Sequence, residues 1–153
     1  MNQSSSQAAL ELSDALLDDL ELTRLPLVNC FMKGCRLARL VGDGDMLDIF
    51  QYELAGYPSG PNGVTSEVWA LAKRANRVYE DKGKDKEVRE RCYTTSIEAL
   101  EGAKTSAETR LLRAQHPLEG SQMRKAITNA NGRIAERREF IYAYVLRLSL
   151  IHI

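Results

Sequence analysis

Paired acidic side chains are the first candidates for catalysis in this sequence. Asp18 and Asp19 are adjacent, and Glu98 and Glu101 are three residues apart. Two carboxylates can divide acid and base roles when a pocket separates their pKa values. Both pairs lie in segments with the spacing of amphipathic helices, and nothing in the sequence predicts a pocket around them. We therefore expect helix-surface residues and not a catalytic pair.

Cysteine and histidine offer little more chemistry. Cys92 could act as a nucleophile, but it lies in a predicted helix with no histidine nearby in the sequence, so a buried thiol is the better interpretation. The two histidines, His116 and His152, lack the close spacing of zinc ligands. Three cysteines without paired spacing do not predict a disulfide framework, and Cys30 and Cys35 fit a helix core. We expect a cytoplasmic protein without a metal or cofactor.

Basic residues recur along two predicted helices and raise the possibility of nucleic-acid binding. A shared stripe of cations could grip a phosphate backbone. Glu136 and Glu139 interrupt this stripe, and no aromatic platform for single strands is evident. A solvated helix face is the favoured interpretation. The alternative is a nucleic-acid contact made by Arg74, Arg77, Arg124, Lys125, Arg133 and Arg137.

Charge is balanced overall but unevenly placed. The chain of 153 residues has 21 basic and 21 acidic residues, which gives no general attraction to nucleic acid or membrane. Residues 1–57 hold 9 acids and 4 bases, whereas residues 58–153 hold 12 acids and 17 bases. The two parts should attract each other or face different partners.

Apolar residues recur every three or four positions along most of the chain, which predicts an all-α fold of about six helices. The expected helices cover 7–21, 23–41, 46–55, 65–79, 88–114 and 121–148, with Thr23, Thr65 or Ser66, and Ser121 as starting caps. The charged segment 80–91 is either a solvated loop or the tip of a helical hairpin. No segment predicts a strand or a membrane span.

Domain organisation follows from the clearest linker, residues 59–63, which is rich in glycine and proline. We predict an acidic three-helix unit at 6–58 and a long-helix region at 65–148. The final residues, SLIHI, resemble the translated read-through of a sequencing adaptor. We expect the natural sequence to diverge from about residue 149 onward and the chain to be a C-terminally truncated fragment.

The stretch QYELAGYP has a local explanation as a helix stop. Gly56 suits a left-handed residue after a helix, Tyr57 can pack back on Tyr52, and Pro58 cannot continue the helix. This interpretation requires no function.

The same stretch also carries a family resemblance. Residues 8–58 resemble the AbiTii domain of bacterial abortive-infection proteins, and four segments support this: ALELSDALLDDL, LTRLPLVNCFMKGCRLARLVGDGD, MLDIFQYEL and the closing signature EL-x-GYP. The signature falls on Glu53, Leu54, Gly56, Tyr57 and Pro58. A later segment, YTTSIEALE, is similar to another part of the family.

The resemblance implies a role in bacteriophage defence and carries over no catalytic residue. We therefore expect a non-enzymatic interaction or sensor module that binds a protein partner or a fused effector domain, or that forms a homo-oligomer. The apolar stripe from Met123 to Leu148 is the expected contact surface, because a long helix needs a partner along its apolar side.

Overall fold

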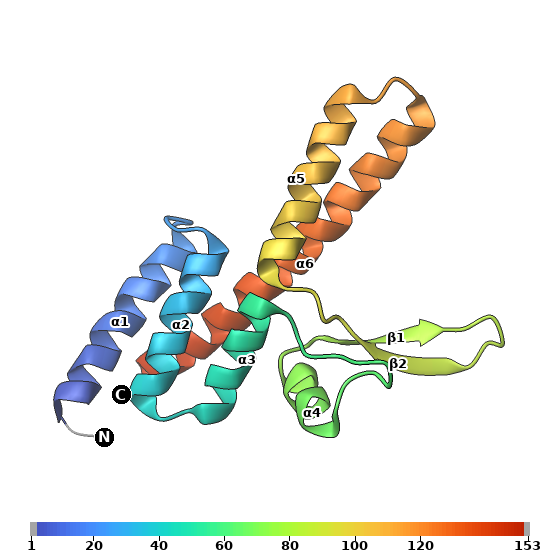
Figure 1. Ribbon diagram of the computed structural model, residues 1–153. Coiled ribbons are helices and arrows are strands. Elements are labelled where there is room, and N and C mark those ends of the chain that lie inside the picture. The colour runs from blue at the N-terminus through green and yellow to red at the C-terminus, as the bar shows by residue number, and fades with distance from the viewer. Residues whose placement is uncertain (1–2, 152–153) are drawn as a thin grey trace.

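The computed structural model describes residues 3–151, and most of them are helical (Figure 1). In chain order the elements are α1 (Gln3–Glu21), α2 (Leu27–Val41), α3 (Gly44–Ala55), α4 (Ser66–Arg74), β1 (Val78–Lys82), β2 (Val88–Cys92), α5 (Ile97–Arg113) and α6 (Pro117–Leu150). The predicted all-α class of about six helices is confirmed, because the described residues form six helices and only a small two-stranded sheet. No helix within residues 3–151 is both long enough and apolar enough to cross a membrane.

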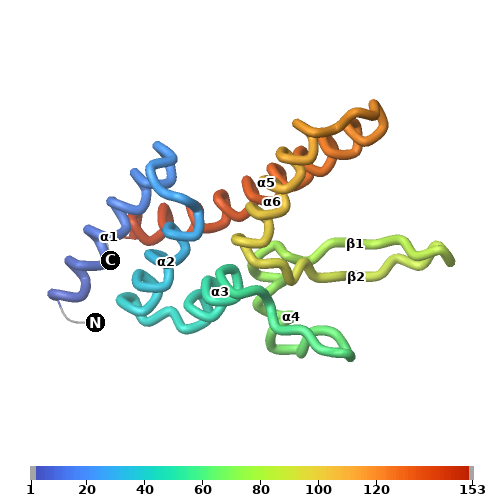
Figure 2. The backbone as a smooth tube through the Cα atoms, turned by 45° about the horizontal axis from the view of Figure 1, so that its top comes forward, coloured from blue at the N-terminus to red at the C-terminus, as the bar shows by residue number. Residues whose placement is uncertain are grey.

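The long helix α6 connects two parts of the molecule. Its C-terminal part lies against α1 and α2, whereas its N-terminal part pairs with α5 in a two-helix arm that projects from the body (Figures 1 and 2). The β1–β2 hairpin is a second projection, with α4 beside its base. The chain thus has a helical body from which an arm and a hairpin extend.

The body is held together by an apolar core centred on Phe50 of α3. Its ring makes edge contacts with Phe31 of α2 and Tyr144 of α6, with centroid distances of 5.4 and 5.3 Å. Such aromatic pairs contribute about 0.5–1.5 kcal/mol each beyond the area they bury. Cys30 and Cys35 are also buried in α2, as predicted. The core fixes α3, whose last turn carries the first two signature residues, Glu53 and Leu54.

The hairpin is the main departure from the predicted secondary structure. We expected helix at 65–79 and 88–114, but α4 ends at Arg74, and Asn76 adopts a positive φ of 57° that asparagine tolerates well. β1 and β2 then pair antiparallel with Tyr79 opposite Arg91. Both strands are rich in charged residues and lack the apolar alternation that predicts a strand. An ion pair between Arg91 and Asp81, at 2.8 Å, bridges the two strands.

Two predicted helix starts are also wrong. α2 begins after Pro26, which leaves it without a side-chain cap, while Thr23 lies in the preceding turn with φ 51°. α6 begins at Pro117 and not at Ser121, because proline is pre-organised for the first turn of a helix. The predicted cap Thr65 is confirmed, since its hydroxyl accepts the Val68 N–H at 3.3 Å.

The predicted division into 6–58 and 65–148 stays a prediction. One core cluster nevertheless contains residues from both ranges, including Phe50 and Tyr144. In the terminal segment that we expect to be foreign to the natural sequence, residues 149–150 are the last of α6 and residue 151 follows the helix. Residues 152–153, which include His152, lie outside the described range.

Candidate functional site

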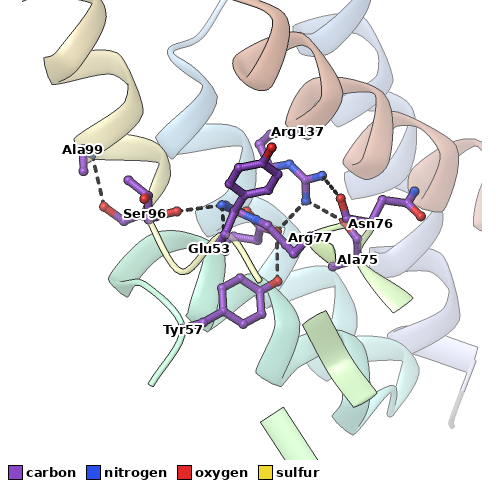
Figure 3. Close-up of polar contacts among 10 residues, drawn as sticks. Glu53, Tyr57, Ala75, Asn76, Arg77, Ser96, Ala99 and Arg137 are labelled. Carbon is purple, nitrogen blue, oxygen red and sulfur yellow. Dashed lines mark hydrogen bonds and ion pairs between the residues drawn. The ribbon is translucent and has the colours of Figure 1, made fainter. Parts of the chain in front are cut away.

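A buried carboxylate lies where the body, the hairpin and the arm meet. Glu53, in the last turn of α3, is 0% exposed. Its Oε1 atom accepts hydrogen bonds from Arg77 Nε at 3.1 Å and from Arg137 Nη1 at 2.8 Å. Its Oε2 atom pairs with Arg77 Nη2 (Figure 3). Both arginines are only 2% exposed, so this is a fully enclosed Arg–Glu–Arg cluster.

The two guanidinium groups also bind main-chain carbonyls, which extends the cluster to other segments. Arg77 Nη1 donates to the carbonyl of Thr95 at 2.8 Å, in the loop between β2 and α5. Arg137 donates through Nη1 to the carbonyl of Ala75 at 2.6 Å and through Nη2 to that of Asn76 at 3.2 Å. Arginine suits this role because its planar fork presents several donors in fixed directions. The cluster therefore ties α3 to the α4–β1 junction, the β2–α5 loop and α6.

The remaining signature residues shape the chain around this carboxylate. The Tyr57 hydroxyl donates to Glu53 Oε1 at 2.9 Å, and the Tyr57 N–H donates to the carbonyl of Thr94 at 2.9 Å. The Tyr57 ring packs on Tyr52 as predicted, with centroids 5.4 Å apart. The helix stop is therefore real, but it also aims Tyr57 at Glu53.

Gly56 differs from the expected left-handed residue. Its φ is 96°, but its ψ is 152°, which places it in an extended region that is almost restricted to glycine. A Cβ atom at this position would also lie 3.2 Å from the Thr94 carbonyl oxygen. The signature glycine thus allows the chain to leave α3 close to the β2–α5 loop.

We expect Gly56→Ala to lower the free energy of unfolding by about 1–3 kcal/mol, since alanine adds backbone strain and the Cβ contact. Urea denaturation would measure this loss. Gly60→Ala is the matched control, because Gly60 also follows α3 and a methyl group there would meet nothing within 4 Å. Equal stability of the two variants would contradict the proposed role of the Gly56 conformation.

Burial raises the pKa of Tyr57 well above its usual range, and the nearby Glu53 carboxylate raises it further. Tyr144 shows a raised pKa for a similar reason, with burial as the main cause and Asp43 as the next. Both phenols therefore stay protonated in the folded chain at pH values where unfolded tyrosine ionises.

A raised phenol pKa makes stability fall at alkaline pH. Below about pH 10, both states keep the proton and the contribution of Tyr57 is complete; above it, the unfolded chain releases the proton and stability declines. We expect Tyr57→Phe to start less stable at pH 8 by about 1–2 kcal/mol, from the lost hydrogen bond, and to decline less steeply between about pH 9 and 11. Urea denaturation midpoints of the wild type and of Tyr57→Phe, measured across this pH range, would show the difference in slope. Tyr79→Phe is the control. A decline as steep as that of the wild type would refute the assignment.

The geometry argues that Glu53 acts as a structural group. A general base must reach a substrate proton, and a metal ligand needs a free lone pair facing the ion. The Glu53 carboxylate is enclosed, and its oxygens already accept from Tyr57, Arg77 and Arg137. Leu54 packs at the edge of the core, and Pro58 is exposed. The signature thus builds a junction between segments.

The cations proposed for nucleic-acid contact are scattered by the structure. Arg77 and Arg137 are buried on Glu53, so neither can face a phosphate in this conformation. Arg133 lies over the ring of Tyr93 at 4.1 Å from its centroid. The other members, Arg74, Arg124 and Lys125, are exposed on α4 and on the arm. No continuous stripe joins all six.

The catalytic alternatives gain no support from their surroundings. Burial is the main effect on the Cys92 thiol and raises its pKa, which disfavours the reactive thiolate. Asp19 is paired with Lys33 at 2.7 Å, and its neighbour Asp18 is exposed on α1.

Our sequence analysis did not predict that Glu53 is a buried ion-pair partner, although the sequence contains a signal for its burial. Met46, Ile49, Phe50 and Glu53 follow one another at intervals of three, one and three residues and share one side of α3. A charge on the buried side of a helix requires a buried partner. The arginine partner on α6, Arg137, likewise lies on the apolar side, four residues before Ile141.

Comparison with known proteins identifies one family. The AbiTii family model matches residues 11–140, a range that includes the Glu53 cluster and both projections. Comparisons with curated proteins and with solved structures gave no match. The name of the matching family associates it with abortive infection, a form of bacterial phage defence. Because one family model covers most of its length, this chain belongs to the AbiTii family.

Proposed function

We propose that this chain is a non-enzymatic module of bacterial phage defence that binds a protein partner through the tip of its α5–α6 arm. The supporting observation is the exposure of two large apolar side chains at that tip. Leu112, near the end of α5, is 88% exposed, and Leu118, at the start of α6, is 68% exposed. Apolar side chains displayed on a projecting element are suited to protein contact.

The arm is also suited to reach a partner. Its two helices contact each other along their length and carry buried alanines, Ala107 and Ala130, on their facing sides. Leu112 and Leu118 lie on either side of the turn that connects α5 to α6. Figure 1 shows this turn at the end of the arm, far from the body. A partner could therefore cover both leucines without disturbing the core.

The apolar stripe from Met123 to Leu148 is a poorer contact surface than we expected. Ile141, Val145 and Leu148 are buried in the body of the protein. Met123 and Ile127, at the other end, are partly covered within the arm. The long helix therefore finds most of its partner surface inside this chain, which moves the proposed contact to the arm tip.

A non-enzymatic role agrees with the use of the titratable groups. The strongly buried carboxylate of Glu53 is occupied by its arginine partners. Its fixed geometry would serve to hold the arm and hairpin at set angles to the body, as an interaction module requires.

The test is to replace both tip leucines, in the variant Leu112→Glu plus Leu118→Glu, and to measure phage plating in the cell that carries the gene. We expect protection to be lost by more than tenfold while stability changes by less than about 0.5 kcal/mol, as for other surface substitutions. Met32→Glu is the control, since Met32 is 58% exposed on α2, away from the arm. Full protection by the double variant would reject the proposal.

A nucleic-acid role is the second candidate, and it now rests on the arm alone. Arg110 and Arg113 on α5 and Arg124 and Lys125 on α6 are all exposed. The informative variant is Arg124→Gln plus Lys125→Gln, because a change at Arg137 would disturb the fold instead. Binding to DNA or RNA that weakens with salt, and weakens again in this variant, would favour this candidate over a protein partner.

A further inference from the structure

We propose a binding site for a small phosphate monoester between the α1–α2 turn and the base of the arm. A surface cavity of about 450 Å³ lies there. Its walls come from the turn at 23–27, from one side of α5 around Lys104, and from Ile134 and Arg138 of α6. Small-molecule sites have volumes of roughly 300–1,000 Å³, so the cavity can hold a phosphate and the small organic group attached to it.

Three cations line this cavity, and two of them are free of acidic partners. Arg24 and Arg138 form no ion pair within residues 3–151, whereas Lys104 is paired with Glu108 at a distance of 3.8 Å. Arg24 is exposed, whereas Arg138 is partly buried, and most other partly buried or buried charges of the described structure are paired, as Glu53 and Asp19 are. Two unpaired guanidinium groups facing one cavity therefore favour an anionic ligand.

Arg138 gives the most specific sign. Its Nη1 atom is buried and has no hydrogen-bond partner among the described residues, the one such side-chain atom there. A buried donor without an acceptor costs free energy, and an ordered ion or water is a usual explanation. An oxyanion bound in the cavity would supply the missing acceptor once the Arg138 side chain turns Nη1 toward it.

The start of α2 adds an independent contribution to the same cavity. Leu25, Pro26 and Leu27 form part of its wall, and the helix begins there without a side-chain cap. The positive end of the helix dipole and the first N–H groups of a helix favour a negative charge. The Thr23 hydroxyl, which we expected to cap this helix, does not do so.

The acidic residues in the wall decide the class of ligand. Glu101 and Glu108 also line the cavity and would repel a ligand that is anionic throughout. They can instead accept hydrogen bonds from hydroxyl groups. A phosphate monoester with a hydroxylated organic part, such as a sugar phosphate, fits both ends: its phosphate binds Arg138 and Arg24, and its hydroxyl groups bind Glu101.

The experiment uses glucose 6-phosphate and inorganic phosphate as probes, with the full chain and at constant ionic strength. A ligand that binds only the folded state raises its thermal stability. We expect glucose 6-phosphate to raise the unfolding temperature and to bind more tightly than inorganic phosphate. Arg138→Gln and, separately, Arg24→Gln should each weaken binding at least tenfold. Arg36→Gln is the control, since Arg36 is exposed on α2 outside the cavity.

The outcomes separate this proposal from the role of the arm, because the arm tip is not part of the cavity. No stabilisation by either probe would overturn the site. Equal stabilisation of the wild type, Arg138→Gln and Arg24→Gln would also overturn it, because binding would then lie elsewhere. Equal affinity for the two probes would overturn the assignment of a hydroxylated ester. The Arg24 variant keeps the test valid if Arg138→Gln fails to fold, since Arg24 lies in an exposed turn.

Discussion

Replacing Glu53 by glutamine should lower the free energy of unfolding by about 3–5 kcal/mol, as expected when one partner of a buried ion pair is removed. The carboxylate is 0% exposed and faces two guanidinium groups that are each 2% exposed. Glutamine keeps the shape but removes the only negative charge in the cluster, and its NH₂ group would point a donor at another donor. For a chain of this size, the melting temperature should fall by roughly 10 °C or more.

Urea denaturation is the measurement, and Glu136→Gln is the matched control. Glu136 is a glutamate adjacent to Arg137 on α6, but it is exposed. Its replacement changes the net charge equally and should change stability by less than about 0.5 kcal/mol. If Glu53→Gln were as mild as the control, the cluster would not be the joint between the segments. An altered denaturant slope would show that the variant had changed the compactness of one state.

The helical body was predictable because its apolar residues follow a regular period. In α2 and α3 the residues at intervals of three and four, such as Phe31, Cys35, Met46 and Phe50, are the ones that the core buries. The helix that ends at Ala55 was predictable from Gly56 and Pro58. These features depend on neighbours within one or two turns, which a single sequence displays directly.

The hairpin was not predictable by the same reasoning. Glu80, Asp81, Arg89 and Arg91 make the strands look like a solvated segment, because the sheet has two strands and leaves much of both faces exposed. The pairing of the strands depends on the junction at Asn76 and on contacts with the loop that follows β2. This junction and this loop lie far apart in sequence. Local propensity is a weak guide where distant contacts decide the structure.

The candidate site was predictable in part. The family signature identified Glu53 and Tyr57 as notable, but the arginine partners of Glu53 come from positions 24 and 84 residues farther along the chain. Arg77 and Arg137 were grouped with exposed arginines because composition does not distinguish a buried guanidinium from a solvated one. Only the apolar neighbours of Arg137 at positions three or four residues away indicate its burial.

Replacing Arg137 by methionine is the second large effect that we predict, a loss of about 2–3 kcal/mol. Methionine leaves the buried carbonyl of Ala75 and the partly buried carbonyl of Asn76 without their donor, and a buried unpaired acceptor costs about 1–3 kcal/mol. The loss is smaller than for Glu53→Gln, because Glu53 keeps Arg77 and Tyr57 as partners. Arg137→Lys should be nearly as damaging, since one ammonium group cannot reproduce the contacts of the guanidinium fork.

A double-mutant cycle decides whether Arg137 acts through Glu53. Each single variant already removes the charge attraction between the two side chains, so Glu53→Gln plus Arg137→Met should cost less than the two single losses together, by about 1–3 kcal/mol. Glu53→Gln plus Arg113→Gln should be additive, because Arg113 is exposed at the far end of α5. Additivity in both cycles would mean that Arg137 holds only the α4–β1 junction. Coupling in the Glu53–Arg137 cycle alone would show that one network fixes α3, the hairpin and the arm. A partner that displaced the arm would then also shift the signature residues.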